Sequence, residues 1–167
     1  MPDAGREGRV GLVVLLLLAM AGTSLWAQET APARQAVVET SAGTFIIDLD
    51  ARAAPGHVAH FVSVAEKGGY EGTIFHRVVR NGMVQGGDPV TRDPARRSLY
   101  GTGGLGVVKD EAKAPRMTGG SVAAVTVPGR SDSAGSQFFI VIVDQPGLDG
   151  RYTVFGHVAD GMETLQA

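Results

Sequence analysis

The residues best suited to chemistry lie in two apolar, strand-like segments, residues 75–88 and residues 135–140. Alternate side chains of a strand point to the same face, so each segment can present a few polar groups on one side. Arg77, Gln85 and Gln137 could then line a single shallow groove. A groove with one permanent cation and two amides suits peptide binding better than hydrolysis, because it offers no nucleophile.

The same segments carry a family resemblance. The pattern FHRVVxxxMxQGGD at residues 75–88, followed by SAGSQFFI at residues 133–140, resembles the cyclophilins, the cyclosporin-binding class of peptidyl-prolyl isomerases. Further matches, in the family's order, are Ala54–Pro55, residues 70–75, 101–104 and 148–156, and Asp110–Glu111. Together they span roughly residues 36–165. The N-terminus, described below, suggests a bacterial member of a secreted or periplasmic type.

The resemblance implies an all-β, mainly antiparallel fold, a closed eight-stranded β-barrel capped by helices. Apolar runs predict strands at residues 36–40, 44–49, 74–79, 83–86, 121–127, 138–143 and 153–158. Pro55 suits a helix start, and apolar residues then recur at helical spacing as far as Ala65. Residues 160–167 look like the start of a second helix, so the family's C-terminal helix and last strand are expected to be missing.

The reaction implied is rotation about X-Pro bonds during protein folding. Its uncatalysed barrier is ~18–20 kcal/mol, and no bond is cleaved. By the resemblance, Arg77 is the catalytic arginine, which would donate to the prolyl nitrogen as the amide twists. Gln85 would orient Arg77 and bind substrate backbone, and Gln137 would support the arginine from behind. Without the resemblance, Arg77 reads as a solvent-exposed strand residue.

The resemblance also implies the walls of a proline pocket. Substrate-binding positions are assigned to Phe75, Met83, Val125, Thr126, Gln137, Phe139, Leu148 and Tyr152. Val125 and Thr126 would grip the residue before proline through their backbone. An alternative alignment places Pro128 there instead, and proline has no N–H to offer.

Two departures from the family weaken the predicted pocket. Gly82 and Gly147 stand where the family usually has large aromatic residues. Weaker substrate binding and weak cyclosporin binding are therefore expected. The two glycines also leave an alternative function open, that of a cyclophilin-like peptide-binding or chaperone module with little turnover.

The N-terminus predicts export. Two arginines precede an apolar run from Val10 to Ala21, and small residues follow, which is the order of a secretory signal peptide over residues 1–27. Cleavage is expected after Ala27, leaving a linker at residues 28–35 and an isomerase domain at residues 36–167. The alternative is an uncleaved N-terminal anchor. We therefore expect a periplasmic or secreted protein that has no contact with the membrane once the signal peptide is cleaved.

Composition narrows the partners. The formal charge of −2 argues against nucleic acid, and without cysteine there are no disulfides. His57 and His60 are one helical turn apart, but no further ligands are evident, so a packing or surface role is favoured over a metal site. No cofactor and no metal are expected. The predicted partners are proline-containing polypeptides, bound by a monomer.

Overall fold

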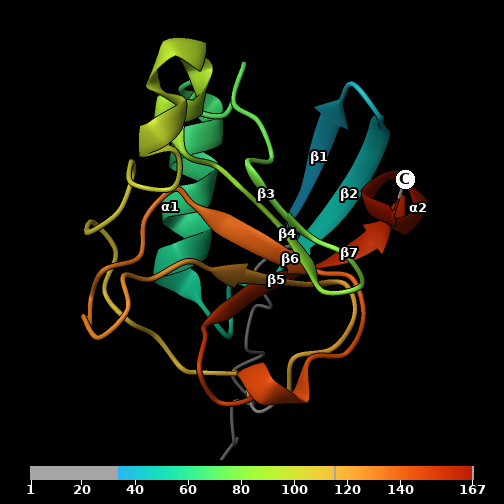
Figure 1. Ribbon diagram of the computed structural model, residues 1–167. Coiled ribbons are helices and arrows are strands. Elements are labelled where there is room, and N and C mark those ends of the chain that lie inside the picture. Colours follow the sequence, from blue (N-terminus) through green and yellow to red (C-terminus); the bar gives the residue numbers. More distant parts are fainter. Residues whose placement is uncertain (1–33, 115, 167) are drawn as a thin grey trace, which may run out of the picture. The chain divides into compact units, whose positions relative to one another are not determined.

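The computed structural model describes residues 34–114 and 116–166 (Figure 1). The predicted signal peptide and most of the predicted linker lie outside these residues. Among the helices that are described, none is long and apolar enough to cross a membrane.

The described chain forms one antiparallel sheet with the strand order β1-β2-β7-β5-β6-β4-β3. Its strands are β1 (Arg34–Thr40), β2 (Gly43–Leu49), β3 (Arg77–Val79), β4 (Met83–Gly86), β5 (Ser121–Ala124), β6 (Phe138–Val141) and β7 (Val154–Asp160). Every pair of neighbouring strands is antiparallel, as expected.

The closed eight-stranded barrel is not confirmed. The sheet is a curled, seven-stranded half-barrel in the part of the chain that is described, and its edges are β1 and β3 (Figure 1). An apolar groove of about 1090 Å³ lies along the β1 edge and is also lined by residues 70–75. In the strand order β1 and β3 stand at opposite ends, so these edge strands are not joined to each other by hydrogen bonds.

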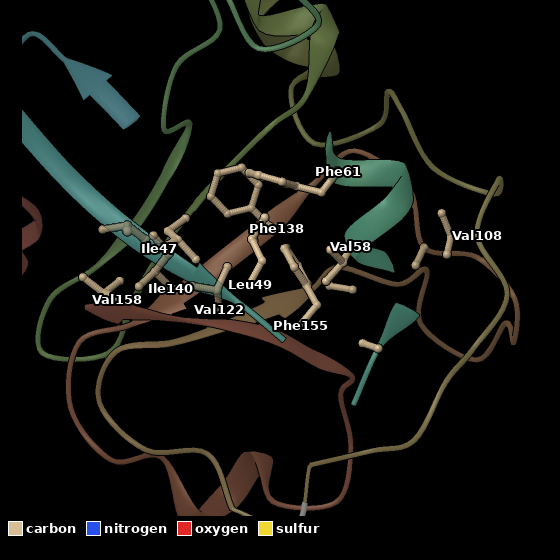
Figure 2. Close-up of a cluster of buried hydrophobic side chains, with 14 of the residues drawn as sticks. Ile47, Leu49, Val58, Phe61, Val108, Val122, Phe138, Ile140, Phe155 and Val158 are labelled. Carbon is tan, nitrogen blue, oxygen red and sulfur yellow. The ribbon is translucent and has the colours of Figure 1, made fainter. Parts of the chain in front are cut away.

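Helix α1 (Pro55–Glu66) packs against one face of the sheet through the large hydrophobic cluster and confirms the predicted helix. Val58 and Phe61 of its apolar stripe are buried, and Phe61 contacts Phe138 and Phe155 with ring centroids 5.8 Å and 5.4 Å apart (Figure 2). Because β-branched and aromatic side chains fill this space closely, the helix and the sheet are held at a fixed distance.

The chain between β4 and β5 contains two short 3₁₀ helices, η1 (Pro89–Arg92) and η2 (Pro94–Leu99). Each begins with proline after an aspartate, Asp88 or Asp93, whose carboxylate accepts a backbone N–H inside the helix. This is the capping arrangement that short helices need. The expected second helix is present as α2 (Met162–Gln166).

Strand alternation divides the core into two clusters. On β5 and β6, Val122, Ala124, Phe138 and Ile140 belong to the large cluster beneath α1, drawn in part in Figure 2. The residues between them, Ala123, Phe139 and Val141, face the other way and form a second cluster with Met117. This second cluster, on the face away from α1, carries the candidate site.

Candidate active site

A row of side chains crosses four neighbouring strands on this second face. In the strand register, Arg77 of β3 lies opposite Gln85 of β4, Gln85 lies opposite Phe139 of β6, and Phe139 lies opposite Ala123 of β5. Side chains opposite each other in antiparallel strands point to the same face, so the cation, the amide and the aromatic ring are neighbours.

The polar part of this row is a directed chain of hydrogen bonds. Arg77 Nη1 donates to Gln85 Oε1 at 3.3 Å, and Gln85 Nε2 donates to Gln137 Oε1 at 3.0 Å. Gln137 Nε2 donates to the carbonyl oxygen of Gly103 at 2.7 Å. A guanidinium can only donate and a carbonyl can only accept, so the two ends of the chain determine the orientation of both amides.

Burial falls steadily along this chain. Gln137 is 1% exposed and Gln85 is 8% exposed, whereas Arg77 at the outer end is exposed. Within the described residues, no carboxylate lies within salt-bridge distance of Arg77. The interior therefore fixes one edge of the guanidinium and leaves its remaining N–H groups free for a ligand.

An apolar surface adjoins the arginine. Met83, Val125, Leu148 and Tyr152 are half-buried and pack on the second cluster, around Phe139. The rings of Phe139 and Tyr152 meet edge to face, with centroids 5.1 Å apart and planes at 84°. The combination of one cation, two amides and a small apolar surface is suited to binding an apolar residue together with its peptide bond.

Val125 follows β5 directly, and its N–H donates to the carbonyl oxygen of Gln137 at 3.1 Å. Val125 therefore lies beside Gln137. Thr126 comes next and is half-buried.

Comparison with known proteins decides the family. Residues 36–167 match the family described as "Cyclophilin type peptidyl-prolyl cis-trans isomerase/CLD". The chain belongs to the cyclophilin-type peptidyl-prolyl cis-trans isomerases. Peptidyl-prolyl cis-trans isomerase-like 1 of Neurospora crassa is 36% identical over 135 residues, which cover 80% of each chain. The Aspergillus niger protein of the same name is 38% identical over 130 residues, 77% of this chain and 76% of that one.

Solved cyclophilins share the fold. A Cryptosporidium parvum cyclophilin, crystallised in the presence of the dipeptide Ala-Pro, aligns with a TM-score of 0.67 and 28% identity over 80% of this chain and 85% of that one. The cyclophilin AquaCyp293 of Hirschia baltica aligns with a TM-score of 0.68 and 21% identity over 82% and 68% of the two chains, which supports the fold alone.

Phe75 is the one predicted site residue that this cyclophilin places elsewhere. Its ring packs with Phe45 and Phe138, at centroid distances of 6.3 Å and 6.2 Å, in the large cluster and along the apolar groove. Residues 74–76 precede β3 and are not in a strand, so alternation does not carry Phe75 to the face of Arg77. Its position gives no support to a role in proline binding.

Of the two glycines that depart from the family pattern, only Gly147 leaves open space. A Cβ atom at Gly147 would meet nothing within 4 Å, whereas one at Gly82 would meet the side chain of Val79 at 2.9 Å. The pocket of this cyclophilin is therefore more open at Gly147 than the family pattern suggests. At Gly82, the side chain of Val79 occupies the space that a larger residue would need.

Two contributors to the site were not predicted. Gly103 supplies the carbonyl oxygen that ends the hydrogen-bonded chain. Met117, which is 1% exposed, fills the floor of the second cluster beneath Phe139. Residues 101–104 match the family pattern, but neither this match nor any other local signal shows which distant residue Gly103 or Met117 contacts.

Proposed function

We propose that this isomerase accelerates X-Pro rotation by holding the Arg77 guanidinium against the nitrogen of the twisting imide. The observation that carries the proposal is the one-directional chain from Gly103 through Gln137 and Gln85 to Arg77. Its buried end fixes the direction of the arginine before substrate arrives, and such preorganisation is the main source of electrostatic catalysis.

The chemistry needs no covalent step. When the amide twists, conjugation is lost and the prolyl nitrogen regains a lone pair, which a guanidinium N–H can meet. An acceleration of ~10⁵ requires about 7 kcal/mol of differential stabilisation of the twisted state. The walls around Phe139 would hold the prolyl ring. Because the N–H of Val125 is bonded to Gln137, the preceding residue would be held by the carbonyl oxygen of Val125 and the backbone of Thr126.

Proline-containing polypeptides are the proposed substrates. The apolar surface formed by Met83, Leu148 and Tyr152 is small and lies beside the arginine, which suits a single prolyl ring with its peptide bond exposed. The Cryptosporidium parvum cyclophilin was crystallised in the presence of Ala-Pro, a dipeptide that contains such a bond.

The direct test compares wild type with Arg77→Ala in an isomerisation assay on a proline tetrapeptide. The expected kcat/KM of the variant is lower by about a hundredfold, the scale of losing one preorganised transition-state donor. Arg77→Lys should recover little, because an ammonium lacks the planar fork and is more strongly hydrated. Equal rates for wild type and Arg77→Ala would favour the binding or chaperone module instead.

We further propose that the protein is exported by residues 1–27 and acts in the periplasm or outside the cell as a monomer. The support is the charge, apolar run and small residues of this segment. N-terminal sequencing after expression in a bacterium should give Gln28 as the first residue, and light scattering should give the monomer mass. An intact N-terminus on membrane-bound protein would favour the uncleaved anchor.

A further inference from the structure

Glu111 lies outside the site, yet it caps the first turn of α1. Its Oε1 accepts the N–H of Gly56 at 2.8 Å, and its Oε2 accepts the N–H of His57 at 2.9 Å. The cap residue Ala54 offers no side-chain acceptor, and the first turn of α1 has no acidic residue. A carboxylate from a distant segment therefore satisfies N–H groups that the helix cannot satisfy itself.

His57 adds a third bond to the same carboxylate. Its Nδ1 lies 2.5 Å from Glu111 Oε2, and its ring is 4% exposed and stacked on Phe155 at 6.4 Å. Burial raises the pKa of Glu111, but the bonds from Gly56 and His57 outweigh it and lower the pKa overall. A Cβ atom at Gly56 would come within 3.2 Å of Oε1, so glycine leaves room for this approach.

The segment that carries Glu111, residues 107–117 apart from residue 115, runs between the two walls of the site, and we call it the brace. On one side, the N–H groups of Val107 and Val108 donate to the carbonyl oxygen of Ala134 at 3.0 Å and 2.9 Å, and Asp110 N–H donates to Asp132 Oδ1 at 2.8 Å. These bonds hold the loop that follows Val125 and Thr126.

On its other side, the brace holds the loop with Leu148 and Tyr152. Ala114 N–H donates to the carbonyl oxygen of Tyr152 at 3.0 Å, and Met117 N–H donates to Asp149 Oδ1 at 2.7 Å. The buried Thr153 Oγ1 donates to the carbonyl oxygen of Glu111 itself at 3.1 Å. Glu111 is thus where the brace is bonded at once to α1 and to the loop that carries one pocket wall.

We propose that Glu111, held by His57, is a positioning residue for the isomerase. By fixing the brace to α1, it sets the separation of the Leu148–Tyr152 wall and the Val125–Thr126 wall around the prolyl ring. This inference rests on the proposed function of the site. It assigns no contact between Glu111 and the substrate.

The effect should appear in KM and not in kcat. The arginine is directed by a separate chain that ends at Gly103, and Gly104 is bonded to Ser136 independently of Glu111. A less rigid pair of walls should therefore weaken the binding of the prolyl ring without changing the orientation of the Arg77 guanidinium. Contacts made equally in the ground state and the transition state change KM alone.

The experiment measures kcat and KM with a proline tetrapeptide for the full-length wild type, Glu111→Ala, Glu111→Gln and a matched control, Asp50→Ala. Asp50 Oδ1 also accepts two backbone N–H groups just before α1, from Arg52 and Ala53, and no described hydrogen bond joins it to the brace. Fractions folded are measured by denaturant unfolding.

For Glu111→Ala we expect KM to rise about tenfold with kcat within about twofold of wild type. Glu111→Gln keeps a neutral acceptor, so its KM should lie between those of the wild type and Glu111→Ala. Asp50→Ala should leave both constants unchanged per folded molecule. If Glu111→Ala does not fold, His57→Phe keeps a stacked ring but loses the Nδ1 contact, and its KM should rise about threefold.

Unchanged constants per folded molecule in Glu111→Ala, or a fall confined to kcat, would overturn the inference. So would a KM rise of equal size in Asp50→Ala, because loss of any cap would then suffice. An inactive wild type in the same assay would instead refute the function on which the inference rests, so the two failures are distinguishable.

Discussion

Replacing Gln137 by methionine should separate the positioning of Arg77 from the packing of the site. Gln137 is 1% exposed and joins two hydrogen bonds, to Gln85 at 3.0 Å and to Gly103 at 2.7 Å. Methionine has a similar length and fills the space without replacing these bonds. The change leaves the buried N–H of the Gln85 amide and the half-buried carbonyl oxygen of Gly103 unsatisfied, and a buried unsatisfied group costs about 1–3 kcal/mol.

We therefore expect the free energy of unfolding to fall by about 3 kcal/mol. The kcat/KM of the molecules that remain folded should fall about tenfold, which corresponds to about 1.4 kcal/mol of lost transition-state stabilisation. Denaturant titration gives the first quantity. Peptide isomerisation, corrected for the folded fraction, gives the second.

Gln35→Met is the matched control, because the amide of Gln35 donates to Asp48 Oδ1 at the surface of β1 and β2. It should change neither quantity appreciably. The reasoning would be refuted if Gln137→Met lost the expected stability but kept wild-type kcat/KM per folded molecule. The buried amides would then stabilise the fold without directing the arginine.

Three further predictions follow from contacts around the site. Gly147→Trp should lower KM about tenfold, because a Cβ atom at this position meets nothing within 4 Å and an indole ring would add a pocket wall. Burying such a ring contributes about 1.5–3 kcal/mol. An unchanged KM would contradict this prediction. Since the folded-state pKa of Glu111 is lowered, its contribution to stability is present above its ordinary value of 4.5 and is lost as pH falls through the lower folded value. Unfolding free energy should therefore fall more steeply in that acid range for wild type than for Glu111→Gln, and parallel curves would be evidence against it. Arg92→Met should lower the free energy of unfolding by about 1 kcal/mol, because this side chain donates to the carbonyl oxygens of Glu71, Gly68 and Gly69, just after the end of α1. The kcat/KM per folded molecule should stay unchanged.

Local patterns predicted most of the elements. The apolar stripe and Pro55 located α1, and alternation on β5 and β6 is what divides Phe138 from Phe139. Alternation did not extend to Phe75, because the strand begins only at Arg77. The assignment of Phe75 to the site came from the family resemblance, and the packing of its ring with Phe45 and Phe138 gives that assignment no support.

Contacts between distant segments could not be predicted. The bond from Gln137 to Gly103 joins residues 34 positions apart, and those from Gly56 and His57 to Glu111 join residues 55 and 54 positions apart. Periodicity and propensity carry no information on such pairs. For the same reason the sequence indicated a pair of histidines on α1 but not the carboxylate that holds one of them.

The most direct test of the central claim follows cis and trans signals of a labelled proline peptide by NMR exchange at saturating protein, for wild type and Arg77→Ala. The peptide's dissociation constant is measured in parallel. If the guanidinium stabilises the twisted imide, the bound exchange rate should fall about a hundredfold in Arg77→Ala while the dissociation constant changes by less than about threefold. A bound exchange rate that stays at the wild-type value, with only weaker binding, would contradict the account.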